Sequence, residues 1–188
     1  MTVVTETERL KLRHLCSDDV NAMHAYLGDA ETMKYYPAPY SHEFVRQAIE
    51  KNLERYEKYG YGLFGVVLKE SGDLIGDCGL VWQDLPDGTE LEVGYHFHRA
   101  YWGHGYATEA ARACIDYAFG NAGVDHVISL IRPENVPSRR VAERNGLRIV
   151  RQIVWKEIVH DVWEISPSVH QSVSSGRRGK SKDERLTD

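Results

Sequence analysis

The sequence predicts a single α/β domain in which a mixed, mostly antiparallel sheet of seven strands carries helices on both faces. Three predicted strands follow one another through residues 62–98, and such a meander is typical of antiparallel pairing. A helix with an apolar stripe then leads to a short buried strand at residues 127–131. The predicted element order, β-α-α-β-β-β-α-β-α-β-β, lacks the regular alternation of a doubly wound fold.

The N-terminal region predicts one strand and two helices. Apolar and charged residues alternate over residues 8–15, which predicts the first strand. Ser17 is the expected N-cap of a helix that ends near residue 27, and Ser41 is the expected N-cap of a longer helix. The apolar stripe of that longer helix consists of Phe44, Val45, Ala48, Ile49, Leu53 and Tyr56.

The remaining elements follow from turn signals and periodicity. The meander comprises strands at residues 62–69, 74–82 and 89–98. The helix after it has a stripe made of Ala107, Ala110, Ala111, Cys114, Ile115, Ala118 and Phe119. Residues 133–144 predict a short helix closed by Asn145 and Gly146, and the two last strands are expected at residues 147–155 and 156–165.

Length and composition indicate one soluble domain. The chain has 188 residues, of which 42% are hydrophobic and 27% charged, so it can bury a full core. Residues 1–166 form the expected domain, and residues 167–188 hold so few apolar side chains that we expect a flexible polar tail. A net charge of −5 argues against a general nucleic-acid binder.

The cysteine spacing and the absence of long apolar runs predict a cytoplasmic protein. No run is long enough to span a bilayer, and the first residues lack the basic and apolar regions of a signal peptide. Cys16, Cys78 and Cys114 are widely spaced and odd in number, so we expect reduced thiols in a cytoplasmic protein.

Gly103 and Gly105 lie between a predicted strand and the first turn of the long helix. Unpaired N–H groups at a helix N-terminus favour negative charge, and glycine lets an anion come close to the backbone. The pattern therefore suits a phosphate or a pyrophosphate. It lacks the Gly-Lys-Ser/Thr ending of a P-loop, and Thr108 stands where a dinucleotide fingerprint has its third glycine. A tight turn without a ligand is the alternative that these residues leave open.

The stretch Trp102-Gly103-His104-Gly105-Tyr106-Ala107 resembles the acyl-CoA pyrophosphate loop of the GNAT acetyltransferase superfamily, Gln/Arg-x-x-Gly-x-Gly/Ala. Gly105 and Ala107 fill the last two defined places, whereas Trp102 departs from the first. A second block, Asn135-Val136-Pro137-Ser138 with Asn145-Gly146-Leu147 after it, is similar to the family's Asn-x-x-Ser and Asn-Gly-Phe. The opening Thr7-Glu8-Arg9-Leu10-Lys11-Leu12-Arg13 resembles the branch that contains the ribosomal-protein N-terminal acetyltransferases.

The resemblance implies a GNAT-like sheet with a central splay between the fourth and fifth predicted strands, where the pantetheine arm of acetyl-CoA lies. Acetyl-CoA is then the co-substrate. Backbone groups around Phe97 and His98 would pair with the pantetheine, and Asn135 would hold it. The residues implied to bind the pyrophosphate are Trp102, Gly103, His104, Gly105, Tyr106, Ala107 and Thr108.

Acetyl transfer to an amine requires a group that accepts the proton of the amine. Glu90 and Glu92 lie two residues apart, hence on one face of their strand. The resemblance favours Glu92, because the branch commonly has an acid in the wording Glu-x-Gly-Tyr; Glu90 and a water are the alternatives. It also makes Ser138 the candidate acid for the departing thiolate. A solvated carboxylate and an ordinary helix hydroxyl are the interpretations without catalysis.

His96, His98 and His104 raise the question of a metal, since His-x-His on a strand puts two rings on one face. No acidic or cysteine ligand accompanies them at short spacing. We therefore expect no metal, and a polar lining of the cleft instead.

The implied function is that of an acetyl-CoA-dependent N-acetyltransferase acting on a primary amine, in the first place a protein or peptide N-terminus. A small amine or an aminoglycoside-like drug is the alternative acceptor, and an acyl-CoA-binding module without activity is the alternative class. We expect neither a membrane nor a nucleic acid as partner, and a homodimer stays open. The acceptor pocket is expected to depend on residues 31–40 and on the last two strands.

Overall fold

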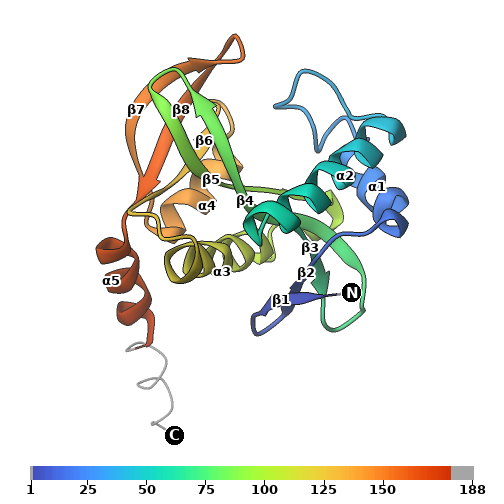
Figure 1. Cartoon of the computed structure of the whole chain (residues 1–188), viewed down its shortest axis with the longest axis horizontal. Coiled ribbons are helices and arrows are strands. Elements are labelled where there is room, and N and C mark those ends of the chain that lie inside the picture. The colour runs from blue at the N-terminus through green and yellow to red at the C-terminus, as the bar shows by residue number, and fades with distance from the viewer. Residues whose placement is uncertain (1, 179–188) are drawn as a thin grey trace, which may run out of the picture.

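The computed structural model describes residues 2–178 as an open, twisted sheet with helices on both faces (Figure 1). The strands are β1 (Val3–Glu6), β2 (Leu10–Arg13), β3 (Leu63–Leu68), β4 (Leu74–Leu85), β5 (Gly88–Phe97), β6 (Val127–Ile131), β7 (Arg148–Trp155) and β8 (Ile158–Ile165). The helices are α1 (Val20–Leu27), α2 (His42–Tyr59), α3 (Tyr106–Asn121), α4 (Val136–Asn145) and α5 (Pro167–Arg178), with short 3-10 turns η1 (Ser17–Asp19) and η2 (Arg99–Tyr101).

The mixed, mostly antiparallel sheet that the sequence predicts is confirmed, but it has eight strands, in the order β1-β2-β3-β4-β5-β6-β8-β7. The prediction of seven missed β1, a strand of four residues that is too short to show a period of its own. It exists because it pairs with β2, with Val3 opposite Arg13.

The sheet is split in its middle. Among the strands of residues 2–178, β5 and β6 are the one parallel pair, and they pair at a single position, with Glu92 opposite Ile128. All other neighbouring strands are antiparallel. β5 pairs with β4 along its whole length, from Gly88 to Phe97. The splay expected between the fourth and fifth predicted strands therefore lies between β5 and β6.

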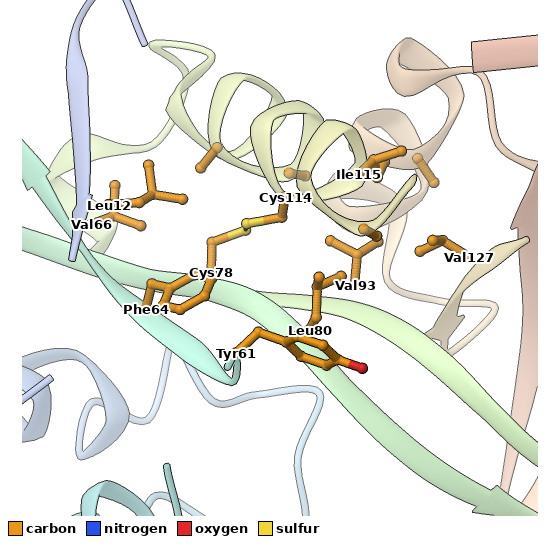
Figure 2. Packing of buried hydrophobic residues seen from close by; sticks show 14 of the residues in the cluster. Leu12, Tyr61, Phe64, Val66, Cys78, Leu80, Val93, Cys114, Ile115 and Val127 are labelled. Carbon is orange, nitrogen blue, oxygen red and sulfur yellow. The ribbon is translucent and has the colours of Figure 1, made fainter. Parts of the chain in front are cut away.

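The main core lies between the sheet and α3. Figure 2 shows Leu80 and Val93 from neighbouring strands facing Ile115 of α3, all at most 1% exposed. The thiols of Cys78 and Cys114 also meet here, with their sulfurs 3.6 Å apart. Burial raises the pKa of the Cys78 thiol, so both residues serve as small apolar side chains.

The opposite face of the sheet carries α1 and α2. The predicted N-cap is found in α2 but not in the first helix. Ser41 caps α2 as predicted, since its Oγ accepts the N–H of Phe44 at 3.2 Å. Ser17 is not the N-cap of the first helix, because it lies within η1. Phe44 and Leu53 are exposed, so the predicted stripe of α2 is wrong at these two positions.

The segment Pro167–Arg178, which the sequence analysis assigns to the flexible tail, forms the helix α5. His170, which is 4% exposed, anchors this helix through an ion pair with Asp116 of α3 and a ring contact with Phe119. The segment has few apolar side chains of its own, and the contact with α3 stabilises its helix. Residues 179–188 lie outside the described part of the chain.

Candidate active site

A cavity of about 470 Å³ opens beside β5, where β6 separates from it. Its walls come from β5, residues 101–108, the end of β6, α4 and the loop at residues 29–41. The predicted site residues that line it are Glu92, Phe97, Trp102, Gly103, Gly105, Tyr106, Ala107, Thr108, Asn135 and Ser138. Two predicted residues, His98 and His104, are outside its lining.

Gly103 and Gly105 adopt left-handed backbone conformations just before α3, with φ of +81° and +82°. A Cβ at Gly103 would have no atom within 4 Å, and one at Gly105 would meet the Arg9 guanidinium at 3.6 Å. Within residues 2–178, the N–H groups of residues 103–108 have no acceptor, and the N–H of Glu109 is the first to bond, to the carbonyl of Gly105. Open space over unsatisfied N–H groups at a helix N-terminus fits a pyrophosphate.

Arg9 supports this loop from the N-terminal hairpin, a contact that sequence patterns did not indicate. It donates to the carbonyl of His104 at 2.9 Å, pairs with Glu109 at 2.6 Å and lies over the ring of Tyr106. Burial would raise the pKa of Glu109, but hydrogen bonds from Thr7 and Arg9 lower it below its usual range. Arg9 therefore fixes the loop, and its positive charge is balanced by Glu109.

The end of β5 is held by Trp102, whose Nε1 donates to the carbonyl of Phe97 at 2.7 Å. The indole thus acts within the protein, at the position where the family motif has Gln or Arg. The N–H of His98 donates to the carbonyl of Ile75 on the β4 side, so it is not available to a ligand. Because successive residues of a strand point their N–H groups to opposite sides, the N–H of Phe97 points into the splay.

Asn135 and Ser138 meet Tyr95 at the start of α4. Asn135 is the N-cap of this helix, and its Oδ1 accepts the N–H of Ser138 at 3.2 Å. The Ser138 Oγ lies 2.8 Å from the Tyr95 hydroxyl, which also donates to the Ser138 carbonyl at 3.2 Å. Burial raises the pKa of Tyr95, so the phenol stays protonated. No sequence motif singled out Tyr95 for this contact.

The structure separates the two carboxylates that the sequence left as alternatives. Glu90 is paired with Arg151 of β7 at 2.7 Å and is not part of the cavity lining. Glu92 lines the cavity; its Oε1 accepts the N–H of Leu130 at 3.0 Å and its Oε2 accepts the amide of Gln83 at 2.7 Å. Burial raises the pKa of Glu92 above its usual range, which makes it a stronger proton acceptor.

The loop at residues 29–41 closes the side of the cavity opposite α4. Thr32, Lys34, Tyr35 and Tyr36 line it, and Arg132 holds the loop by donating to the carbonyl of Tyr35 at 3.0 Å. The loop that is expected to shape the acceptor pocket thus borders the cavity, and its role toward an acceptor stays a prediction. The last two strands, β7 and β8, contribute no residue to the lining.

No group of three His, Cys, Asp or Glu side chains within residues 2–178 is arranged to hold a metal ion. Over the same residues, no helix is both long and apolar enough to cross a bilayer.

A split sheet with unsatisfied helix N–H groups beside the split is the arrangement expected of an acyl-CoA-dependent transferase. A family model described as "Acetyltransferase (GNAT) domain" matches residues 9–148. YkkB of Bacillus subtilis is 36% identical over 148 residues, which are 78% of this chain and 86% of that protein. The chain belongs to the GNAT family of acetyltransferases, which use acetyl-CoA as co-substrate.

Solved structures share this fold over most of the chain. A GNAT-family acetyltransferase from Bacillus anthracis superposes with a TM-score of 0.72 at 29% identity, covering 88% of this chain and 98% of that one. A putative ribosomal-protein-serine acetyltransferase from Vibrio cholerae gives 0.72 at 22% identity, with 89% and 100% covered. An aminoglycoside acetyltransferase in complex with coenzyme A gives 0.72 at 13% identity, with 87% and 98% covered.

Proposed function

We propose that this acetyltransferase acetylates the N-terminal amine of a protein or peptide. The observation that carries the choice is the charge of the cavity lining. Glu92 is the one carboxylate among the described lining residues, whereas Lys34, Arg140 and Arg144 are cations. A polycationic aminoglycoside would need several acidic partners there, and a peptide N-terminus brings a single positive charge.

The resemblance of residues 7–13 to the ribosomal-protein branch supports the same acceptor, and so does the fold shared with the Vibrio cholerae enzyme. A small amine is the second candidate acceptor, because an aminoglycoside acetyltransferase has the same fold.

The proposed chemistry divides between the two sides of β5. Acetyl-CoA supplies an activated acetyl thioester. The unsatisfied N–H groups of residues 103–108 bind its pyrophosphate, and the N–H of Phe97 donates to the thioester oxygen as negative charge develops there. Such a donor contributes about 2.7–4 kcal/mol in other acyl transfers.

Glu92 and Ser138 complete the proton transfers in this proposal. Glu92 accepts a proton from the acceptor nitrogen, since it is the carboxylate in the lining and burial raises its pKa. Ser138 donates a proton to the departing thiolate and regains one from water in the cavity, while the Tyr95 hydroxyl 2.8 Å from its Oγ orients the serine. Holding amine and thioester together contributes more than either group, about 7–11 kcal/mol.

A panel of amines with acetyl-CoA, read by release of free thiol, tests the proposal. The panel comprises peptides with free N-termini, the same peptides with acetylated N-termini, lysine side-chain amines and aminoglycosides. We expect turnover with free N-termini and none with the blocked peptides. Preference for an aminoglycoside would refute the acceptor, and acetyl-CoA binding without turnover of any amine would make the chain a binding module.

A further inference from the structure

A carboxylate is fully buried behind the acceptor side of the cavity. Asp77 of β4 is 0% exposed and has two partners: its Oδ2 accepts the hydroxyl of Tyr26 at 2.9 Å, and its Oδ1 lies 2.9 Å from Nδ1 of His96. Burial of a carboxylate costs several kcal/mol before its partners offset the loss, so an apolar residue would serve packing better. The mechanism above uses none of these three residues.

The His96 ring also borders the cavity, beside the ring of Tyr36. His96 is a lining residue, and its side chain is 17% exposed. Within the described residues its Nε2 is buried and has no hydrogen-bond partner. Because the Asp77 carboxylate can only accept a hydrogen bond, Nδ1 of His96 carries the hydrogen. Nε2 of the neutral ring then has a lone pair without a hydrogen-bond partner.

His96 shares one face of β5 with Glu92, and Gly94 lies between them. A Cβ at Gly94 would have no atom within 4 Å, so the strand leaves open space there. Four residues of strand span about 13 Å, which leaves room for an acceptor between the two side chains. Tyr36, whose ring centroid is 5.2 Å from that of His96, closes this space from the loop at residues 29–41.

An acceptor amine must lose two protons to become an amide. At neutral pH it arrives as an ammonium ion, which has no lone pair for attack. The first proton leaves before attack, and the second leaves after the C–N bond forms. One of the two reaches the thiolate in the balanced reaction, and the other goes to solvent.

We propose that His96 accepts the first of these protons and that Asp77 and Tyr26 position its ring. The N–H bond of the ammonium breaks, its electron pair stays on nitrogen as the nucleophile, and the proton bonds to Nε2. Asp77 stabilises the resulting imidazolium, which returns the proton to water in the cavity. Glu92 then accepts the second proton. This inference rests on the proposed acetyl transfer to an amine.

The charges around the ring support this role. Burial alone would lower the pKa of His96, but the Asp77 carboxylate raises it, and Glu92 adds to the effect. The other titratable groups packed here are the phenols of Tyr26, Tyr36 and Tyr40, which are neutral around pH 7. His96 is therefore a better proton acceptor than an isolated imidazole, and it accepts protons only above its raised pKa.

The test is the pH profile of kcat/KM for the best peptide acceptor in wild type, His96→Gln and Asp77→Asn. A range from about pH 6 to about pH 9.5 spans the pKa of a protein N-terminus, about 7.7–8.0. We expect His96→Gln to lose about 10²–10⁴-fold below that pKa and progressively less above it, where the amine is already neutral. Asp77→Asn should move the acidic limb to lower pH, because the imidazole loses the charge that raises its pKa.

The control is His126→Gln, since His126 pairs with Asp125 on the surface and is not a lining residue. Its profile should match wild type. A loss in His96→Gln that is the same at every pH, or no loss at all, overturns the inference while the acetyltransferase stands. A wild type that acetylates no amine overturns both.

A measurement without substitutions covers the case in which Asp77→Asn does not fold. Titration of the His96 ring by nitrogen NMR in wild type should show a raised pKa and hydrogen on Nδ1 in the neutral form. Hydrogen on Nε2 in the neutral ring would leave no acceptor facing the cavity, and would overturn the inference.

Discussion

Replacing Gly105 with valine tests the loop that carries the coenzyme assignment. Gly105 is the N-cap of α3 and has φ of +82°. A Cβ there would meet the Arg9 guanidinium at 3.6 Å, an ordinary contact, so no clash within the protein forbids the change. The left-handed backbone costs a residue with a Cβ about 1–2 kcal/mol. At about 2–4 °C per kcal/mol for a chain of this size, the Tm should fall by about 2–8 °C.

The effect on acetyl-CoA binding should be larger than the effect on stability. The valine methyl groups would stand over the unsatisfied N–H groups of residues 103–108. A hydrogen bond to a charged group contributes about 1.5–3 kcal/mol, so losing one or two raises the Kd by about 10-fold to more than 100-fold. Titration calorimetry with acetyl-CoA measures this, and circular dichroism checks the fold.

Gly60→Val is the matched control. Gly60 ends α2 with φ of +79°, and a Cβ there would have no atom within 4 Å, so its backbone cost is the same. It lies outside the cavity lining, and its variant should lose stability without losing affinity. A folded Gly105→Val protein with wild-type affinity would refute the loop assignment. Equal losses of affinity in both variants would attribute the effect to stability alone.

Four further predictions follow from the site and the core. Glu92→Gln should keep acetyl-CoA affinity but lose about 10²–10⁴-fold in kcat above the raised pKa of Glu92, where wild type holds the carboxylate ionised; full activity of this variant across the pH range would exclude Glu92 as a base. Ser138→Ala should slow turnover most with thioesters whose thiol is least acidic, and a loss independent of the thiol would contradict its role as the acid. Truncation after Ser166 should lower the Tm, because α5 packs on α3, while acetyl-CoA affinity holds; a loss of affinity would place α5 in the site. Asp19→Asn breaks a buried ion pair with Arg13 and should cost about 3–5 kcal/mol near pH 7. The pKa of Asp19 is lowered in the folded protein, so that stabilisation is present above its usual value of 3.8 and is lost as pH falls further; urea unfolding of both proteins at several pH values measures it, and an equal difference at every pH would contradict it.

Local rules were sufficient for the glycine loop and the helix that follows it. The spacing of Ala110, Cys114 and Ala118 predicted a buried stripe, and all three are 0% exposed. The two glycines adopt the left-handed conformation that makes glycine useful before a helix. These features depend on residues within one or two helical turns of each other, which is the range over which sequence periodicity is informative.

Short or polar elements depended on contacts that sequence spacing does not contain. The strand β1 forms by pairing with β2, and Thr7 and Arg9 in the turn between them bond to Glu109, about a hundred residues away in the chain. The helix α5 forms where His170 reaches Asp116. Neither segment has the apolar periodicity that would predict it alone.

The sequence by itself determined the family, the glycine loop before α3 and the strand that carries Glu92, because each of these depends on contiguous residues. The tertiary structure decided which side chains face the cavity. Glu90 and Glu92 are equivalent by spacing, and only the arrival of Arg151 from β7 separates them. In the sequence, Asp77 has no feature that distinguishes it from other strand residues. Only the register of β4 and β5 shows that it lies opposite His96. The physical reason is that pairing register and the choice of buried partners are properties of the packed sheet, where residues far apart in the chain compete for the same positions.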